Sequence, residues 1–421
     1  MYQKTVLNNG VRIITEKIPY VYSVSMGIWV SVGSRDEGDG ERGITHFIEH
    51  MLFKGTQKRT ALDIAKELDA VGGFANAFTS KENVCFHAKV LDRHLHLVVD
   101  VLTDIFLNST FSPQEIEREQ QVILQEIRMI EDTPDEYVHI LFQERFWENN
   151  PLGLPIYGSA EAIERIDRNR IVEYLSTTFH PERIVIAAAG NLEHQEFVDL
   201  LAPAMEALES SPRVMRRARP SERDFVQVIT KDLEQVHLCL GMPGTSQVDD
   251  ARYACYLLNA ILGSSMSSRL FQEIRERRGL AYSVYSFANS HEDTGLLGVY
   301  AGISSENVEE TLRVIHDQLS LLAVEPISEA ELSAAKEQLK GSMYLNAEST
   351  DSRMNRLAKN EFLFGRCVPF EESEEKINGV EREDILKWFK EAYDPKNLAL
   401  ILLGPTDIDT TMLEGLIGRR G

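Results

Sequence analysis

The sequence predicts an α+β protein of two homologous domains, each an antiparallel sheet packed with helices. Three segments of the first half recur in the second half at offsets of 214 to 216 residues, which indicates a duplication. Within each half, strand patterns come first, helical patterns follow and strand patterns return, an order typical of helices layered on a sheet. The 421 residues also exceed what one core usually supports.

The repeated segments define the expected domain boundaries. Residues 11–15 recur as 226–230, residues 111–116 as 327–332, and residues 180–190 as 394–404. We therefore expect a first domain at 1–210, a linker at 211–222 and a homologous second domain at 223–421. The linker segment is polar and contains Pro212 and Pro220, which suit an exposed connection.

Hydrophobic periodicity predicts the elements of the first half in order. Strands are expected where apolar and polar residues alternate or where a short apolar run occurs, at 11–15, 24–32, 83–90 and 184–189. Helices are expected at 44–54, 61–71, 94–107 and 113–131. Gly55 is expected to cap the first helix, and Ser112 with Glu115 is expected to form a capping box at the start of the last.

Charge and cysteine content exclude several functions. The chain has 44 Lys and Arg against 66 Asp and Glu, and its net charge of −22 is unsuited to a nucleic-acid binder, which needs a basic face. The four cysteines are widely spaced, without a CxxC pair, which argues against a disulfide scaffold, a thiolate zinc ribbon and a cytidine-deaminase-like site. Residues 1–10 are polar and no run of about 18 apolar residues occurs. We expect a cytoplasmic protein without a membrane partner.

The sharpest functional signal is the pattern H-x-x-E-H at residues 46–50. His46 and His50 are four residues apart, so on a helix both imidazoles project from one face. Glu49 lies on nearly the same face. Two neutral imidazoles suit a zinc ion, and the adjacent carboxylate suits proton transfer from a water that the metal activates. The alternative is a helix whose histidines face a polar interface.

A third ligand is expected, because catalytic zinc usually has three protein ligands and one open position. Glu119 and Glu126 lie seven residues apart on the predicted helix 113–131, on the side of its apolar stripe. Inward carboxylates are costly unless they are paired or coordinated. Glu126 as a ligand, with Glu119 orienting a histidine, removes that cost. The alternative places both on the exposed edge of a charged helix.

The second half lacks this set of residues. No histidine occurs between His237 and His291, and at an offset of 216 residues Glu126 aligns with Ser342. We therefore expect one metal site per chain, occupied by zinc, although another divalent transition metal also suits these ligands.

Together these motifs resemble the inverzincin peptidases of the pitrilysin family. The resemblance covers essentially the whole chain and is strongest for the short two-domain branch, which includes the bacterial processing proteases and the mitochondrial processing peptidase. The segments that carry it are 46–50, the Glu119/Glu126 pair, 72–80, 269–275 and 279–283.

The resemblance implies roles for the residues of the first domain. It assigns zinc binding to His46, His50 and Glu126, and it makes Glu49 the general base for the attacking water. The physics agrees, because a carboxylate beside the metal can take a proton from water and return it to the leaving amine.

The resemblance also implies roles for Arg275 and Tyr282. A developing oxyanion needs donors beyond the metal, and in relatives an arginine and a tyrosine seven residues apart in the second domain reach the substrate. Without the resemblance, Arg275 would be a residue that complements a helix dipole and Tyr282 a packed strand residue.

Residues 76–78 are the expected substrate contacts. An extended peptide that adds to a sheet edge is bound by backbone hydrogen bonds, which tolerate many sequences. The resemblance places Asn76 and Ala77 on such an edge, and Phe78 is expected beside the metal in a side-chain pocket. The alternatives are a turn residue for Asn76, after Gly72, and ordinary core for Phe78.

The expected function is that of a zinc metalloendopeptidase for unstructured peptides or presequence-like segments. Relatives enclose substrate with four such domains, so a chain with two is expected to form a homodimer, in which Arg275 and Tyr282 serve the other subunit. A heterodimer with a partner that lacks the motif is the alternative. The acidic charge suits basic, extended peptides.

Two other functions remain as alternatives. One is a non-catalytic binding or scaffold subunit of the same fold, against which the complete set of His46, Glu49, His50 and Glu126 speaks. The other is a different metal hydrolase, such as an amidase, which would need a small closed pocket.

Overall fold

The computed structural model describes residues 2–209, 217–325 and 327–418, which form two compact units. Unit 1 comprises Met1–Met129, Leu154–Arg217 and Leu345–Cys367, and unit 2 comprises Ile130–Gly153, Ala218–Tyr344 and Val368–Gly421. Residues 211–216 of the predicted linker lie outside the described residues. Because each unit combines segments from both halves of the sequence, the packing crosses the boundary expected from the repeat.

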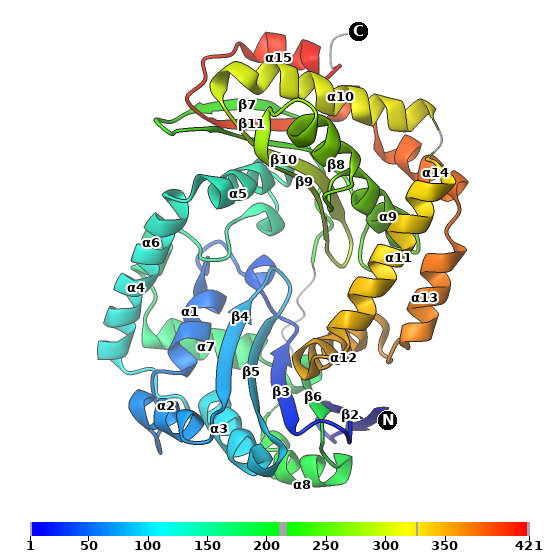
Figure 1. Ribbon diagram of the computed structural model, residues 1–421. Coiled ribbons are helices and arrows are strands. Elements are labelled where there is room, and N and C mark those ends of the chain that lie inside the picture. The colour runs from blue at the N-terminus through cyan, green and yellow to red at the C-terminus, as the bar shows by residue number, and fades with distance from the viewer. Residues whose placement is uncertain (1, 210–216, 326, 419–421) are drawn as a thin grey trace. The chain divides into compact units, whose positions relative to one another are not determined.

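Unit 1 is built on a mixed sheet whose described strands follow the order β1-β2-β6-β3-β5-β4 (Figure 1). Among the described strands of this sheet, only β2 and β6 pair in parallel, and the other neighbours are antiparallel. The strands are β1 Tyr2–Val6, β2 Arg12–Lys17, β3 Ser23–Val30, β4 Phe74–Thr79, β5 Val84–Leu91 and β6 Ile184–Gly190. The central strands β3 and β6 are almost entirely buried, as expected for strands covered on both faces.

The helices of unit 1 come from both halves of the chain. Those of the first half are α1 Ile44–Leu52, α2 Ala61–Asp69, α3 Leu95–Asn108, α4 Pro113–Glu131, α6 Ala160–Ile163, α7 Arg168–Thr178 and α8 His194–Met205. From the second half, α12 Thr350–Phe364 packs Met354, Leu357 and Ala358 against buried side chains of the sheet, such as Trp29. The buried hydroxyls of Ser25 and Thr350 are 2.7 Å apart and add a polar tie between β3 and α12.

Unit 2 repeats the plan with a described strand order of β7-β11-β8-β10-β9. Its strands are β7 Val226–Thr230, β8 Val236–Pro243, β9 Ala281–Ser290, β10 Gly295–Ile303 and β11 Ala399–Gly404. Its helices are α5 Pro134–Phe146, α9 Arg252–Leu262, α10 Val308–Val324, α11 Glu329–Asn346, α13 Phe370–Gly379, α14 Arg382–Ala392 and α15 Thr410–Leu416. Here α5, from the first half, covers one sheet face through Val138, Phe142 and Phe146.

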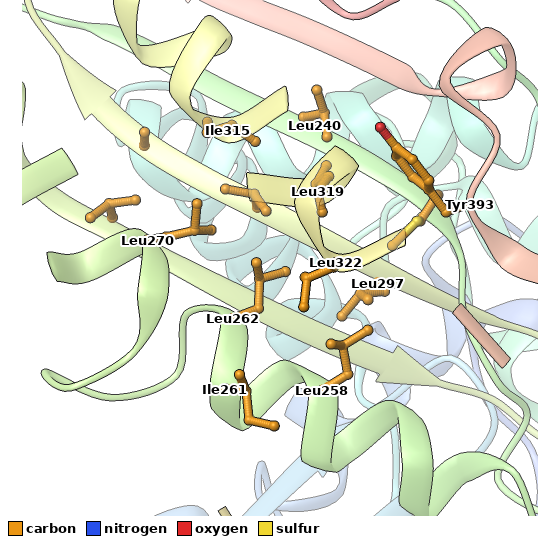
Figure 2. Packing of buried hydrophobic residues seen from close by; sticks show 14 of the residues in the cluster. Leu240, Leu258, Ile261, Leu262, Leu270, Leu297, Ile315, Leu319, Leu322 and Tyr393 are labelled. Atoms are coloured by element: carbon orange, nitrogen blue, oxygen red, sulfur yellow. The ribbon is translucent and has the colours of Figure 1, made fainter. Parts of the chain in front are cut away.

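The opposite sheet face of unit 2 carries its larger core. Leu240 of β8 and Leu297 of β10 pack with residues of α9 and α10, including Leu258 and Leu319 (Figure 2). These side chains are almost fully removed from water, and burial of each contributes about 1.5–3 kcal/mol.

The predicted elements of the first half are all present, with small shifts at their ends. The helix expected at 113–131 has these bounds, and Ser112 Oγ accepts a hydrogen bond from the Glu115 backbone N–H at 3.3 Å. The prediction that Gly55 caps the first helix is wrong, because α1 ends at Leu52 and Gly55 instead forms an isolated bridge with Thr60. Among the described residues, none of the helices has the length and hydropathy that a bilayer span requires.

Candidate metal centre

The helix α1 carries the H-x-x-E-H pattern, and its first turn is held by a carboxylate. Gly43 precedes the helix with φ of 83°, and a Cβ at this position would lie 2.6 Å from the Tyr157 carbonyl oxygen, so glycine is required. The carboxylate of Glu37 accepts hydrogen bonds from the backbone N–H groups of Gly43 at 2.7 Å and Thr45 at 2.9 Å. These bonds satisfy donors that a helix start leaves unpaired.

The helix α4 presents the predicted acidic pair. Its apolar stripe, with Ile123 and Ile127, is buried in unit 1. Glu119 lies on this stripe and is only 3% exposed, whereas the Glu126 side chain is 32% exposed. The prediction that both carboxylates face inward therefore describes Glu119 fully and Glu126 in part.

The structure brings the three predicted metal ligands together. One ligand atom from each of His46, His50 and Glu126 lies within 4.8 Å of the others. Glu126 Oε1 lies 3.8 Å from His46 Nε2, and Glu126 Oε2 lies 3.7 Å from His50 Nε2. Both imidazoles thus direct the same nitrogen toward one carboxylate.

This donor set fits zinc. Zinc takes nitrogen and oxygen donors at about 2.0–2.2 Å, and tetrahedral donors at that distance lie about 3.3–3.6 Å apart, close to the 3.8 and 3.7 Å that separate the Glu126 oxygens from the two imidazoles. Carboxylate and imidazole ligands are those of catalytic zinc sites, which keep a further position open.

A second carboxylate fixes the orientation of His50. Glu119 Oε2 lies 3.1 Å from His50 Nδ1, and Glu119 Oε1 lies 2.6 Å from Lys54 Nζ. A proton on Nδ1 that is donated to Glu119 leaves the lone pair of Nε2 available to a metal. The predicted orienting role of Glu119 thus has a contact that supports it.

Burial and charge separate the two histidines. Burial lowers the pKa of His46 to about 3, helped by the neighbouring His50, so His46 is neutral near pH 7. Burial also lowers the pKa of His50, but the hydrogen bond to Glu119 and the charges of Glu49 and Glu126 outweigh it and raise this pKa.

Glu49 belongs to α1 and contacts the neighbouring strand β4 through its side chain. The Thr79 hydroxyl, at the end of β4, donates a hydrogen bond to Glu49 Oε2 at 2.7 Å. Burial raises the pKa of the Glu49 carboxyl, while Thr79 and His50 oppose this shift. A raised pKa makes this carboxylate a stronger base than that of a solvent-exposed glutamate.

Residues 76–78 lie within β4, at the end of the sheet order, so one side of this strand is not paired with another described strand. Asn76 is exposed, and its Oδ1 accepts a hydrogen bond from the Ala77 N–H at 2.9 Å. Phe78 is half-buried and its ring meets that of Trp29 edge-on, with centroids 5.2 Å apart. Asn76 is therefore a strand residue, and Phe78 has the core contact that was the alternative.

Arg275 and Tyr282 are brought together in unit 2. The Arg275 guanidinium lies 4.7 Å from the ring centroid of Tyr282 and 4.8 Å from that of Phe271. Arg275 belongs to a π-helical turn, Phe271–Glu276, a geometry frequently found at functional sites. Tyr282 is 79% exposed, so its hydroxyl is accessible from solvent.

Sequence reasoning missed three residues around the metal centre. Lys54 follows His50 by four residues, a spacing that signals a shared helix face. Glu37 and Thr79 had no such signal, because Glu37 contacts α1 from the irregular segment before the helix and Thr79 contacts it from a strand that packs against it.

Comparison with known proteins identifies the family. Residues 12–160 match the family model described as "Insulinase (Peptidase family M16)", and residues 165–339 match "Peptidase M16 inactive domain". The protein named "Uncharacterized zinc protease YmxG" of Bacillus subtilis is 39% identical over 406 residues, covering 96% of this chain and 99% of its own. The chain belongs to peptidase family M16. This confirms the predicted resemblance to a short bacterial peptidase of the pitrilysin type.

Other similarities of this M16 chain agree. "Uncharacterized zinc protease SCO5738" of Streptomyces coelicolor is 41% identical over 393 residues, covering 91% of this chain and 85% of its own. A crystal structure of a protease from Helicobacter pylori superposes with a TM-score of 0.90 at 20% identity, covering 96% and 99% of the two chains. An M16 inactive domain structure from Pseudomonas fluorescens also gives 0.90. These structures confirm the predicted two-domain α+β fold.

Proposed function

We propose that this M16 chain is a zinc metalloendopeptidase that hydrolyses extended, unstructured peptides, with one zinc ion per chain. The observation that carries the proposal is the convergence of His46, His50 and Glu126, with ligand atoms within 4.8 Å of one another. Glu49, on the same helix as both histidines, supplies the acid–base group that hydrolysis needs. The relatives named zinc proteases support zinc as the metal.

The reaction divides between the metal and the carboxylate of Glu49. Zinc, when bound, polarises the scissile carbonyl and lowers the pKa of water toward about 7. Glu49 takes a proton from the attacking water and returns it to the leaving amine. The raised pKa of Glu49 makes its carboxylate a stronger proton acceptor than that of an exposed glutamate.

The edge of β4 supports the proposed substrate class. A peptide that pairs with Asn76 and Ala77 would be held through its backbone, so many sequences are accepted, provided that the peptide is extended. The net charge of −22 favours basic peptides, because opposite charge increases the rate of encounter.

Arg275 and Tyr282 are proposed to stabilise the transition state. The two side chains are stacked and accessible, and together they offer a guanidinium and a phenol as donors to a developing oxyanion. We propose that they act across a homodimer, in which each subunit contributes this pair to the zinc site of the other.

The test is cleavage of a mixture of basic, unstructured peptides, followed by mass spectrometry of the products. We expect cleavage that 1,10-phenanthroline abolishes and that its non-chelating 1,7 isomer leaves intact. Glu49→Gln should retain zinc but lose at least about 100-fold in kcat, because general base catalysis is removed. His50→Ala should lose zinc as well, measured by elemental analysis.

Two matched variants control for indirect effects. Glu117→Gln changes an exposed carboxylate of α4, and His96→Ala removes an exposed imidazole of α3; both should keep wild-type zinc content and turnover. Wild-type turnover in Glu49→Gln would remove Glu49 from the reaction. Stoichiometric zinc in the wild type without any cleavage would favour the scaffold subunit instead.

A further inference from the structure

Thr79, the last residue of β4, links two parts of the proposed site. It belongs to the strand proposed to bind the peptide, and its side chain contacts Glu49, the proposed general base. The Thr79 hydroxyl donates to Glu49 Oε2 at 2.7 Å, and the Thr79 backbone N–H also bonds this carboxylate, so one residue holds the general base through two donors. The helix α1 packs beside β4, which brings the two groups together (Figure 1). The role inferred for Thr79 rests on the proposed function.

The turn after Thr79 is tightly anchored. The Ser80 N–H donates to the Asn83 carbonyl at 2.8 Å, and the Ser34 N–H donates to the Ser80 carbonyl at 3.2 Å. A Cβ at Gly33 would lie 2.4 Å from that same Ser80 oxygen, so the approach of the two loops depends on glycine. These bonds fix the end of β4 at which Thr79 lies.

A buried ion pair reinforces this anchor. Arg35 Nη1 lies 2.7 Å from Glu82 Oε1, with side chains 1% and 9% exposed. The Arg35 N–H also donates to the Lys81 carbonyl at 2.8 Å. Breaking a buried pair by removing one partner is strongly unfavourable, so this pair adds to the hydrogen bonds that hold the turn after Thr79.

The position of Thr79 in the strand relates it to the peptide. Side chains alternate along a strand, so Thr79 and Ala77 lie on the same face of β4. Ala77 is paired with Phe86 and Thr79 with Val84 across β5, in one uninterrupted register. A peptide that pairs with the other edge of β4 is therefore held on the backbone that also carries the Thr79 hydroxyl.

We propose that Thr79 is a positioning residue that orients the Glu49 carboxylate relative to a peptide bound on β4. Thr79 does not contact the metal ligands in the contacts described above. Its loss should therefore lower the rate of the chemical step and leave zinc binding and peptide binding unchanged.

The experiment compares Thr79→Val, which keeps the shape but removes the donor, with Thr79→Ser, which keeps the donor. We expect Thr79→Val to lower kcat by about 10- to 100-fold, the scale of a misplaced catalytic group, with KM within about twofold and zinc affinity unchanged. Thr79→Ser should return kcat to within about threefold of wild type. Thr5→Val is the matched control, since Thr5 lies on β1 at the opposite end of the same sheet order and also has a bonded hydroxyl.

Several results would overturn the proposal. A wild-type kcat in Thr79→Val would show that the hydrogen bond has no catalytic role. Loss of zinc, or a rise in KM that accounts for the whole defect, would assign Thr79 a structural role. Should Thr79→Val not fold, Thr79→Ala is used as the variant that lacks the hydroxyl and is compared with Thr79→Ser. If Thr79→Ser had a kcat as low as that of Thr79→Ala, the hydroxyl would not be the group that positions Glu49. An active Glu49→Gln would remove Glu49 from the reaction and thereby overturn the role of Thr79, whereas a wild type that cleaves no peptide would refute the proposed function itself.

Discussion

At the scale of single residues, the metal centre depends on a buried carboxylate that has two partners. Glu119 receives His50 on one oxygen and Lys54 on the other, at 3.1 and 2.6 Å. A buried carboxylate is tolerated when its oxygens are paired in this way. Lys54 therefore stabilises the carboxylate that contacts His50, one of the proposed metal ligands.

Removal of Lys54 should weaken zinc binding. We expect Lys54→Met to raise the zinc Kd by about 10-fold, because outer groups that orient ligands typically contribute 10- to 100-fold. Lys54→Arg should retain most of the affinity, since it keeps the positive charge. The measurement is a competition titration against a chromophoric chelator.

The control for that titration is Lys58→Met, which removes an exposed lysine from the loop after α1. It should bind zinc as wild type does. If Lys54→Met also bound zinc with wild-type affinity, the Lys54–Glu119 contact would have no part in organising the site.

The residues predicted from spacing and those that were missed differ in one physical respect. His46, Glu49 and His50 belong to one helix, so the helical period determines which face they share. Glu126 was singled out because a carboxylate beside the apolar stripe of a helix is costly unless it is paired or coordinated. The contact of Thr79 with Glu49 depends on how β4 packs against α1, which no local period records.

At the scale of elements, hydrophobic periodicity predicted which helices and strands exist better than it predicted which sheet each helix packs against. The helix α4 was predicted with its bounds because an apolar stripe and a polar start agree. The exchange of α5 and α12 between units was not predicted. A helical pattern shows that one face will be buried but not against which sheet, and the repeat favoured a simple division of the chain.

The segment 269–275, singled out as a family signature, contains a structural ion pair. Arg269 contacts both oxygens of Glu331 at 2.7 and 3.1 Å. Glu331 also accepts hydrogen bonds from Ser328 at the start of α11. Arg269 thus ties the segment before the π-helical turn to the first turn of α11, which is a role distinct from that proposed for Arg275.

This ion pair makes an acid-dependent contribution to stability. Burial alone would raise the pKa of Glu331, but Arg269 and Ser328 outweigh it and lower the pKa to about 2. A carboxyl with a lowered pKa stabilises the fold above its unfolded pKa of about 4.3, and this is lost as the pH falls toward 2. Because a third of the side chain is exposed, we expect Glu331→Gln to cost about 1 kcal/mol at pH 7.

Chemical denaturation at pH 7 and at pH 3 measures this effect. The free-energy difference between Glu331→Gln and wild type should shrink at the lower pH. Glu337→Gln, an exposed residue of the same helix, should differ little from wild type at either pH. A gap for Glu331→Gln that is the same at both values would contradict a pairing that depends on the charge of Glu331.

At the scale of the whole molecule, the duplication visible in the sequence corresponds to two sheets of similar strand order, each with one parallel pair. The proposed ligands occur in one repeat only, since Ser342 occupies the place of Glu126 in the other. The two repeats therefore differ in chemistry while keeping one architecture, which agrees with the "inactive domain" description of the model that matches 165–339.

This asymmetry gives a test of the proposed homodimer. If each active site combines Glu49 of one subunit with Arg275 of the other, Glu49→Gln and Arg275→Ala are each inactive alone but complement each other. In a hybrid dimer one site has both groups and the other has neither. With random exchange, half of the dimers are hybrids, so the mixture should recover about a quarter of wild-type activity. If both groups act within one chain, every site lacks one of them and no activity returns. The measurement is the activity of the mixture, with the formation of hybrid dimers verified by native mass spectrometry. A wild type that is monomeric under assay conditions would refute the dimer outright.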